Sequence, residues 1–255
     1  MPFKTRLSAL VGTMLLAYCA ILLSSPALAS TEVNKDSLAN PLDYFISSLY
    51  NNFEWQEAKP QYDIFKRGVV GYLNLKSQNR LSDKGILTLV DFRSSANVER
   101  MWVLDLKGNR VLYHNLVAHG RNSGDEYATK FSNRFGSYQS SLGFYVTGAT
   151  YTGKHGLSLR LDGVEPLINS NARKRAVVMH SAEYVSHDFA NQYGRLGRSL
   201  GCPAIPVENH KEVIDRLSDN TCLFIFYNSV DYAGQTTLHN EQIAHTFLVS
   251  NGHDL

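Results

Sequence analysis

The residue with the strongest chemical potential in this chain is Cys202, which lies between Gly201 and Pro203. Glycine lets the backbone turn tightly, and the following proline favours an extended conformation at the cysteine. Cationic side chains close to a thiol favour the reactive thiolate, and Arg195 and Arg198 come shortly before Cys202. We therefore expect Cys202 to be a nucleophile.

A cysteine nucleophile needs a base that takes its proton, and His180 is the first candidate. It directly follows the β-prone run 176–179. A strand there would hold the imidazole ring rigidly while the ring faces a groove. Ser181 could orient the imidazole through its hydroxyl or its backbone carbonyl. His187 is the competing candidate, but it lies in a polar segment that indicates a loop.

The remaining site residues are expected in the same segment as the cysteine. The backbone N–H groups of Gly201 and Cys202 are the natural donors to an oxyanion. Arg195 and Arg198 could bind a substrate carboxylate or lower the pKa of the thiol, and otherwise they are ordinary solvated arginines. Ser199 is expected either to bind substrate or to hydrogen-bond within the loop.

Cys222 lies in a β-branched and aromatic run, 221–227, that predicts a buried strand. Its thiol would then pack as a small apolar group. The alternative is a disulfide between Cys202 and Cys222, as is common in exported proteins. The sequence has no C-x-x-C or H-E-x-x-H spacing, so no metal site is expected.

The first 29 residues have the pattern of an export signal. Lys4 and Arg6 precede an uncharged apolar run, 7–23, and small residues end the segment at Ala27 and Ala29. An uncleaved anchor helix is the alternative, because the run is near the lower length limit for a membrane span. Export would place the protein in the periplasm or cell envelope, or outside the cell.

The chain has 255 residues, enough for one domain with a sizeable core. Without Lys4 and Arg6 the basic residues fall from 25 to 23, the number of acidic residues. This balance gives no reason to expect a nucleic acid or an electrostatically bound membrane as partner. Beyond residue 29 no apolar segment is long enough to cross a bilayer.

The pattern of apolar residues predicts a mainly β domain with a few helices. Residues 30–81 form a helical lead-in, with one helix from Pro41 to about residue 51 and another over 62–75, weakened by glycines. The predicted strands are 86–92, 101–106, 110–119, 143–147, 157–161, 176–179 and 221–227, with a helix over 207–217. Short strands separated by turn signals favour a sandwich or barrel over 82–230, and 231–255 is expected to be a loose tail.

His180-Ser181 followed by Ser199-Leu200-Gly201-Cys202 resembles the signature of the YkuD-type L,D-transpeptidase catalytic domain family. In that family a histidine and a small residue precede an S-x-G-C element, and a glycine-bearing strand lies upstream, here 141–146. The resemblance covers about 86–227. The family pattern usually continues with an aliphatic residue and an arginine, where this chain has Pro203 and Ala204. The chain is thus similar to a Cys-Pro variant branch, in which Arg198 could replace the missing arginine.

The resemblance implies a β-rich domain that acts on peptidoglycan tetrapeptide stems without a cofactor. Cys202 would attack the carbonyl of the L-centre of diaminopimelate, with His180 as base, and terminal D-Ala would leave a thioester acyl-enzyme. An amine of a second stem would then take the acyl group. Water in its place would make the site an L,D-carboxypeptidase, and carbapenems are implied as covalent inhibitors.

Two other classes remain open from the residues. Thr221-Cys222 on a strand resembles the sortase cysteine, but that arrangement needs an arginine on a later strand and none follows Arg216. A non-catalytic envelope-binding module would contain the disulfide between Cys202 and Cys222.

Overall fold

The computed structural model describes residues 40–55, 58–252 and 255, which fall within one compact unit. The predicted export signal lies outside these residues. Within the described part of the chain, the helices are all too short or too polar to cross a membrane.

Six helices and eight strands are formed by the described residues. The helices are α1 (Pro41–Asn52), α2 (Tyr62–Ser77), α3 (His187–Tyr193), α4 (His210–Leu217), α5 (Val230–Gln235) and α6 (Glu241–Ser250). The strands are β1 (Ile86–Asp91), β2 (Met101–Asp105), β3 (Arg110–Asn115), β4 (Gly143–Gly153), β5 (Gly156–Gly163), β6 (Val178–Ser181), β7 (Ala204–Ile205) and β8 (Cys222–Phe226).

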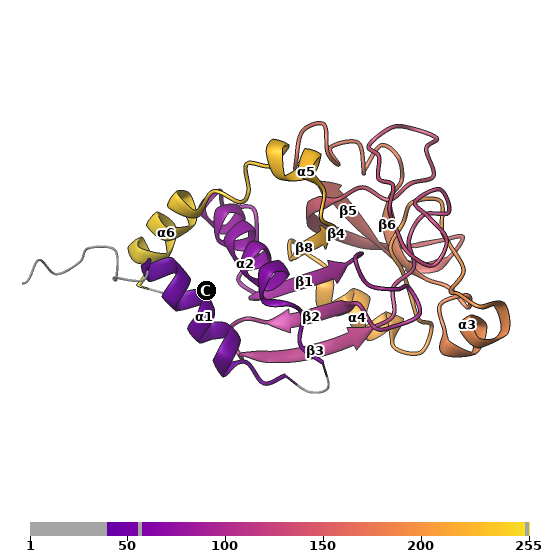
Figure 1. Cartoon of the computed structure of the whole chain (residues 1–255), viewed down its shortest axis with the longest axis horizontal. Helices are drawn as coiled ribbons and strands as arrows, with labels where there is room; N and C mark the ends of the chain where they lie inside the picture. Colours follow the sequence, from indigo (N-terminus) through magenta and orange to yellow (C-terminus); the bar gives the residue numbers. More distant parts are fainter. Residues whose placement is uncertain (1–39, 56–57, 253–254) are drawn as a thin grey trace, which may run out of the picture. The chain divides into compact units, whose positions relative to one another are not determined.

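All eight strands belong to one sheet in the order β3-β2-β1-β8-β4-β5-β6-β7. Figure 1 labels the strands from β3 to β6 in this order. Its two edges approach each other, because the chain beyond β3 runs alongside β7. The Ala118 N–H donates to the Ala204 carbonyl at 2.8 Å, and Gly120 forms a further bridge with Ser199. The sheet is therefore nearly closed, which confirms the prediction of a mainly β domain with a few helices and corresponds to the barrel of the two predicted alternatives, sandwich or barrel.

The glycines that weaken the prediction of α2 are the places where this helix meets the sheet. A Cβ on Gly71 would lie 2.0 Å from the ring of Phe144, and one on Gly68 would lie 2.5 Å from the side chain of Leu89. The absence of these side chains lets the helix approach the sheet closely. Packing thus compensates for the poor helix propensity of glycine.

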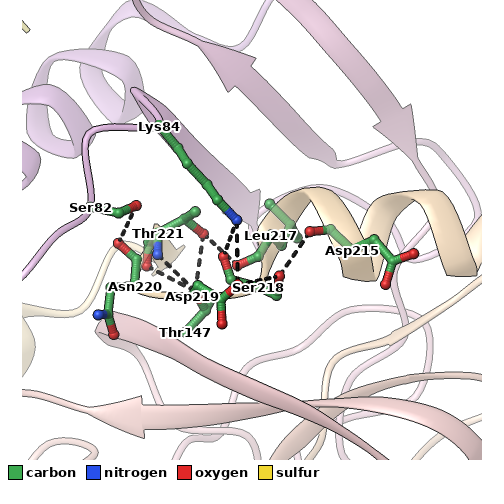
Figure 2. Close-up of polar contacts among 9 residues, drawn as sticks. All are labelled: Ser82, Lys84, Thr147, Asp215, Leu217, Ser218, Asp219, Asn220 and Thr221. Atoms are coloured by element: carbon green, nitrogen blue, oxygen red, sulfur yellow. Dashed lines mark hydrogen bonds and ion pairs between the residues drawn. The ribbon is translucent and has the colours of Figure 1, made fainter.

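The turn between α4 and β8 is held by a set of polar residues that we call the turn cluster. Its members are Ser82, Lys84, Thr147, Ser218, Asp219, Asn220 and Thr221 (Figure 2). The Thr221 N–H donates to Thr147 Oγ1 at 2.8 Å, and Lys84 Nζ donates to the Ser218 carbonyl at 2.7 Å. These bonds join the chain before β1, the middle of β4 and the start of β8, which is the central strand between them.

The C-terminal segment is not a loose tail, and this expectation was wrong. It forms α5 and α6, and α6 packs against α1 and α2 (Figure 1). Asn74 Nδ2 in α2 donates to the Leu238 carbonyl at 2.8 Å, while Ala244 and Leu248 are buried. The exposed side of α6 holds apolar as well as polar residues, while Ala244 and Leu248 bury the helix against the rest of the domain.

The other predicted elements are present, with differences at their ends. The strand around Gly143 extends to Gly153 and forms a hairpin with β5, while α4 begins at His210 and leaves Val207 exposed. Helix α3 and the short β7 were not predicted. His180 lies inside β6 instead of after it, because the strand is shifted by two residues relative to the predicted range.

Candidate active site

Strands β6 and β7 bring His180 and Cys202 to one pocket. The two strands are parallel neighbours in which His180 pairs with Ala204, and Cys202 lies just before β7. Both side chains line a pocket of about 390 Å³. The pairing of β6 with β7 thus brings together two residues that are more than twenty positions apart in the sequence.

The Cys202 thiol is free and half-buried. Its Sγ accepts a hydrogen bond from the Val178 N–H at 3.5 Å and donates to the Ala176 carbonyl at 3.7 Å. Cys222 is also free and is fully buried in β8, so the predicted alternative of a disulfide is wrong in this structure. The strand that contains Cys222 places its side chain in the core, away from the pocket.

Burial raises the pKa of the Cys202 thiol, while the Val178 N–H and the charges of Arg175 and Lys154 lower it to a smaller extent. The net shift of the Cys202 pKa is upward, whereas the sequence predicted that neighbouring cations would lower it. Arg195 and Arg198, on which that expectation depended, do not contribute. Cys202 therefore rests as a thiol, which would have to lose its proton to a base before it could act as a nucleophile.

The orientation of the His180 ring is fixed by its own strand and by a second histidine. Its Nδ1 lies 2.9 Å from the Ser181 carbonyl oxygen, so an N–H there donates and leaves Nε2 as the acceptor. The ring of His155 stacks on it at 4.5 Å. Burial lowers the pKa of His180, although the hydrogen bond to the Ser181 carbonyl opposes this shift. A neutral imidazole with a free Nε2 can accept a proton.

Ser199 organises the turn that presents the cysteine. Its hydroxyl accepts from the Gly201 N–H at 3.0 Å and donates to the Cys202 carbonyl at 2.6 Å. Gly201 has φ of +123°, and a Cβ there would lie 2.8 Å from the Gln139 carbonyl, so this position requires glycine. Of the two expected oxyanion donors, the N–H of Gly201 is engaged, whereas that of Cys202 has no partner among the described residues.

The two arginines singled out from the sequence differ in position. Arg198 lines the pocket, but its Nη1 donates to the carbonyls of Arg121 and Gly124 and lies 2.7 Å from the Asp125 carboxylate. Arg195 is outside the pocket lining and donates to the Leu196 carbonyl at 2.8 Å.

Several pocket residues were not found from the sequence. The β4–β5 hairpin contributes Tyr151, Lys154 and His155, and the segment before β6 contributes Arg175. The Arg175 guanidinium donates to carbonyls and hydroxyls of residues 132–141. The hairpin glycines signal a turn, but nothing in the sequence indicates that this turn lies beside His180.

The competing base His187 lies apart from the cysteine. It begins α3, is exposed, and its Nε2 is 2.7 Å from the Glu99 carboxylate. The pocket that it lines does not include Cys202. Within the described residues, no group of three His, Cys, Asp or Glu side chains is arranged to hold a metal ion.

A thiol and an imidazole that share one pocket of a nearly closed sheet define a cysteine–histidine site on a β-rich domain. Residues 56–226 match the family model of the L,D-transpeptidase catalytic domain, and the chain belongs to this family. The resemblance seen in the sequence is therefore confirmed.

Three solved structures illustrate what the chain is similar to. An L,D-transpeptidase from Mycobacterium smegmatis is 16% identical, with 56% of this chain and 59% of that chain covered and a TM-score of 0.35. One from Stackebrandtia nassauensis is 13% identical, with coverages of 74% and 90% and a TM-score of 0.34. An L,D-transpeptidase in complex with imipenem is 13% identical, with coverages of 56% and 59% and a TM-score of 0.34. The chain thus spans less than two thirds of the length of the first of these structures. The comparison with curated proteins found no match to this chain.

Proposed function

We propose that this protein is an exported, cysteine-dependent L,D-transpeptidase that acts on peptidoglycan tetrapeptide stems. The observation that supports it most directly is that Cys202 and His180 line one pocket in a chain of this family. Residues 1–29 would direct it to the periplasm or cell envelope, where these stems are found. The reaction requires no cofactor.

In the first half-reaction, Nε2 of His180 takes the thiol proton as the sulfur attacks the carbonyl of the L-centre of diaminopimelate. The pKa directions fit this step, because a thiol and a neutral imidazole are the resting forms. The Cys202 N–H, which has no partner among the described residues, stabilises the developing oxyanion. The imidazolium returns its proton to the leaving D-Ala amine, and a thioester remains on Cys202.

In the second half-reaction an amine of another stem attacks the thioester. His180 accepts the amine proton and returns it to the departing sulfur. Water in place of the amine would give L,D-carboxypeptidase activity at the same site. A carbapenem would acylate the same sulfur, and a structure similar to this chain is an L,D-transpeptidase in complex with imipenem.

The decisive experiment compares the wild-type protein with Cys202→Ala and Cys202→Ser, with release of D-Ala from a disaccharide-tetrapeptide as the readout. We expect release to fall to background in both variants. Mass spectrometry after imipenem treatment should show one adduct, located on Cys202. The control is Cys222→Ala, which keeps the nucleophile and should keep the adduct. Full D-Ala release by a Cys202 variant would overturn the proposal.

A further inference from the structure

The pocket that contains Cys202 is built for an anion. Among the described residues that line it are three permanent cations, Lys154, Arg175 and Arg198, and two histidines. The lining contains no aspartate or glutamate within the described part of the chain. A half-enclosed site with this balance of charge favours a negatively charged ligand.

The three cations differ in whether their donors are already used. Arg198 donates to two carbonyls and to the Asp125 carboxylate. Both terminal nitrogens of Arg175 donate to backbone and hydroxyl oxygens of residues 132–141. The ammonium of Lys154, in contrast, has no hydrogen bond and no ion pair with any described residue. Of the three cations that line the pocket in the described part of the chain, it is the one whose charged group is wholly available to a ligand.

The position of Lys154 follows from the pairing of three strands. Gly153 and Gly156 pair at the tip of the β4–β5 hairpin, and Ser158 of β5 pairs with His180 of β6. The ring of His155 stacks on that of His180 at 4.5 Å, so the tip lies beside the proposed base. The charge of Lys154 also reaches the thiol, because it lowers the pKa of Cys202.

We propose that Lys154 is the specificity-determining residue that binds a carboxylate of the substrate. This inference rests on the proposed function, in which the terminal carboxylate of D-Ala is three covalent bonds from the attacked carbonyl carbon. A cation at the mouth of the pocket would hold that carboxylate while the sulfur attacks. A lysine ammonium is a flexible point charge, which suits a carboxylate on a small leaving group. Lys154 takes the role for which Arg198 was considered, because Nη1 of Arg198 already pairs with the Asp125 carboxylate and two carbonyls, whereas the Lys154 ammonium has no counter-ion among the described residues.

The first test needs no enzymatic activity. Iodoacetate and iodoacetamide both alkylate the thiolate, but only iodoacetate carries a negative charge. The ratio of their two alkylation rates is therefore independent of the fraction of Cys202 that is ionised. We expect Lys154→Met to lower the ratio of iodoacetate to iodoacetamide rates at Cys202 by about 3- to 10-fold, the range of a charge-assisted contact. Lys154→Glu should lower it further.

The matched control is Lys174→Met, which removes the same charge from an exposed lysine outside the pocket lining. It should leave the ratio within about twofold of wild type, since a charge outside the pocket lining is screened from the sulfur by solvent. An unchanged ratio in Lys154→Met, or an equal fall in the control, would overturn the inference.

The second test uses substrate and separates the two proposals. For a tetrapeptide with a free terminal carboxylate, Lys154→Met should raise KM by about 10-fold, as expected for a lost charge-assisted contact, with a smaller change in kcat. For the same peptide as its terminal carboxamide, wild type and variant should have the same KM. Equal effects on acid and amide would contradict the inference. If wild-type protein released no D-Ala while the alkylation ratio still fell, the proposed function would fail and the carboxylate site would stand.

Discussion

The Cys202 pocket and the turn cluster are two polar regions of one sheet, and they differ in how their polar groups are used. In the turn cluster the buried hydroxyl of Thr221 donates to the Leu217 carbonyl at 2.8 Å, and that of Thr147 accepts from the Thr221 N–H (Figure 2). In the pocket, the Cys202 N–H, His180 Nε2 and Lys154 Nζ have no partner among the described residues.

This difference separates groups that hold the fold from groups that are available to a ligand. Buried polar groups stabilise a fold when they are paired, and leaving one unpaired costs free energy. A site that must bind and react keeps such groups free. The comparison therefore predicts that pocket variants lose activity and keep stability, whereas turn-cluster variants lose stability and keep activity.

The largest effect is expected for His180→Ala. Loss of a general base lowers the rate by about 10²- to 10⁴-fold, so D-Ala release should nearly disappear. The melting temperature should fall modestly, because the ring also donates from Nδ1 to the Ser181 carbonyl and stacks on His155, so activity is compared at a temperature at which both proteins are folded. The control is His187→Ala, which removes an exposed imidazole from outside the pocket and should retain activity. If His187→Ala were inactive and His180→Ala active, the base would be wrongly assigned.

A second expected effect is a pH dependence of the free energy of unfolding, caused by a buried histidine in the segment beside the pocket. His119 Nδ1 accepts from Arg100 Nη2 at 2.9 Å, and the His119 carbonyl accepts from the Ser199 N–H. Burial, aided by the charge of Arg100, lowers the pKa of His119 to about 4. In the unfolded chain His119 binds its proton near pH 6.5, so the contribution of the neutral ring to the free energy of unfolding should be complete above that pH. It should fall by about 3 kcal/mol as the pH drops to 4.

Denaturant unfolding between pH 7.5 and 4.5 measures this effect. His180 and His239 also have a lowered pKa, so they contribute in the same direction. The informative variant is therefore His119→Asn, which keeps an acceptor for Arg100 and cannot titrate. Its stability should depend less steeply on pH than that of wild type. An equally steep dependence would show that His119 does not contribute.

The part of the fold that could be predicted is the part encoded in local pattern. Strand β8 is a continuous apolar run, and α1 begins where Asn40 accepts from the Leu42 N–H and Pro41 follows. Helix α6 was missed because its apolar residues do not mark one buried side: Ala244 and Leu248 are buried, whereas Ile243 and Val249 are exposed. Its partners are α1 and α2, which are far away in sequence.

The residues of the candidate site also divide into those that the local sequence predicts and those whose position depends on strand pairing. Cys202 and His180 were predicted because their immediate neighbours form a recognisable chemical pattern. Lys154 and Arg175 were not, because the register of β4, β5 and β6 brings them to the pocket. A lysine in a glycine-flanked hairpin resembles any solvated turn residue until the neighbouring strand is known.

In the turn cluster, Thr147→Val should destabilise the protein by about 1–3 kcal/mol, because it leaves the buried Thr221 N–H without its acceptor. Chemical denaturation at pH 7.5 measures this change, and D-Ala release at low temperature should be unaffected. The control is Thr152→Val, an exposed threonine of the same strand, which should stay within about 0.5 kcal/mol of wild type. A loss of activity without a loss of stability would break the comparison.

The smallest expected effect is that of Lys84→Ala. Lys84 Nζ donates to the Ser218 carbonyl at 2.7 Å, just beyond the last turn of α4, and lies 3.8 Å from the Asp219 carboxylate. A cation at a helix C-terminus contributes about 0.3–1 kcal/mol, and salt screens it. We therefore expect a small loss of stability at low ionic strength that shrinks in 1 M NaCl, with Lys130→Ala as the exposed control. A loss as large as that of Thr147→Val would mean that the outer contacts of the turn cluster hold the fold as strongly as its buried hydroxyls.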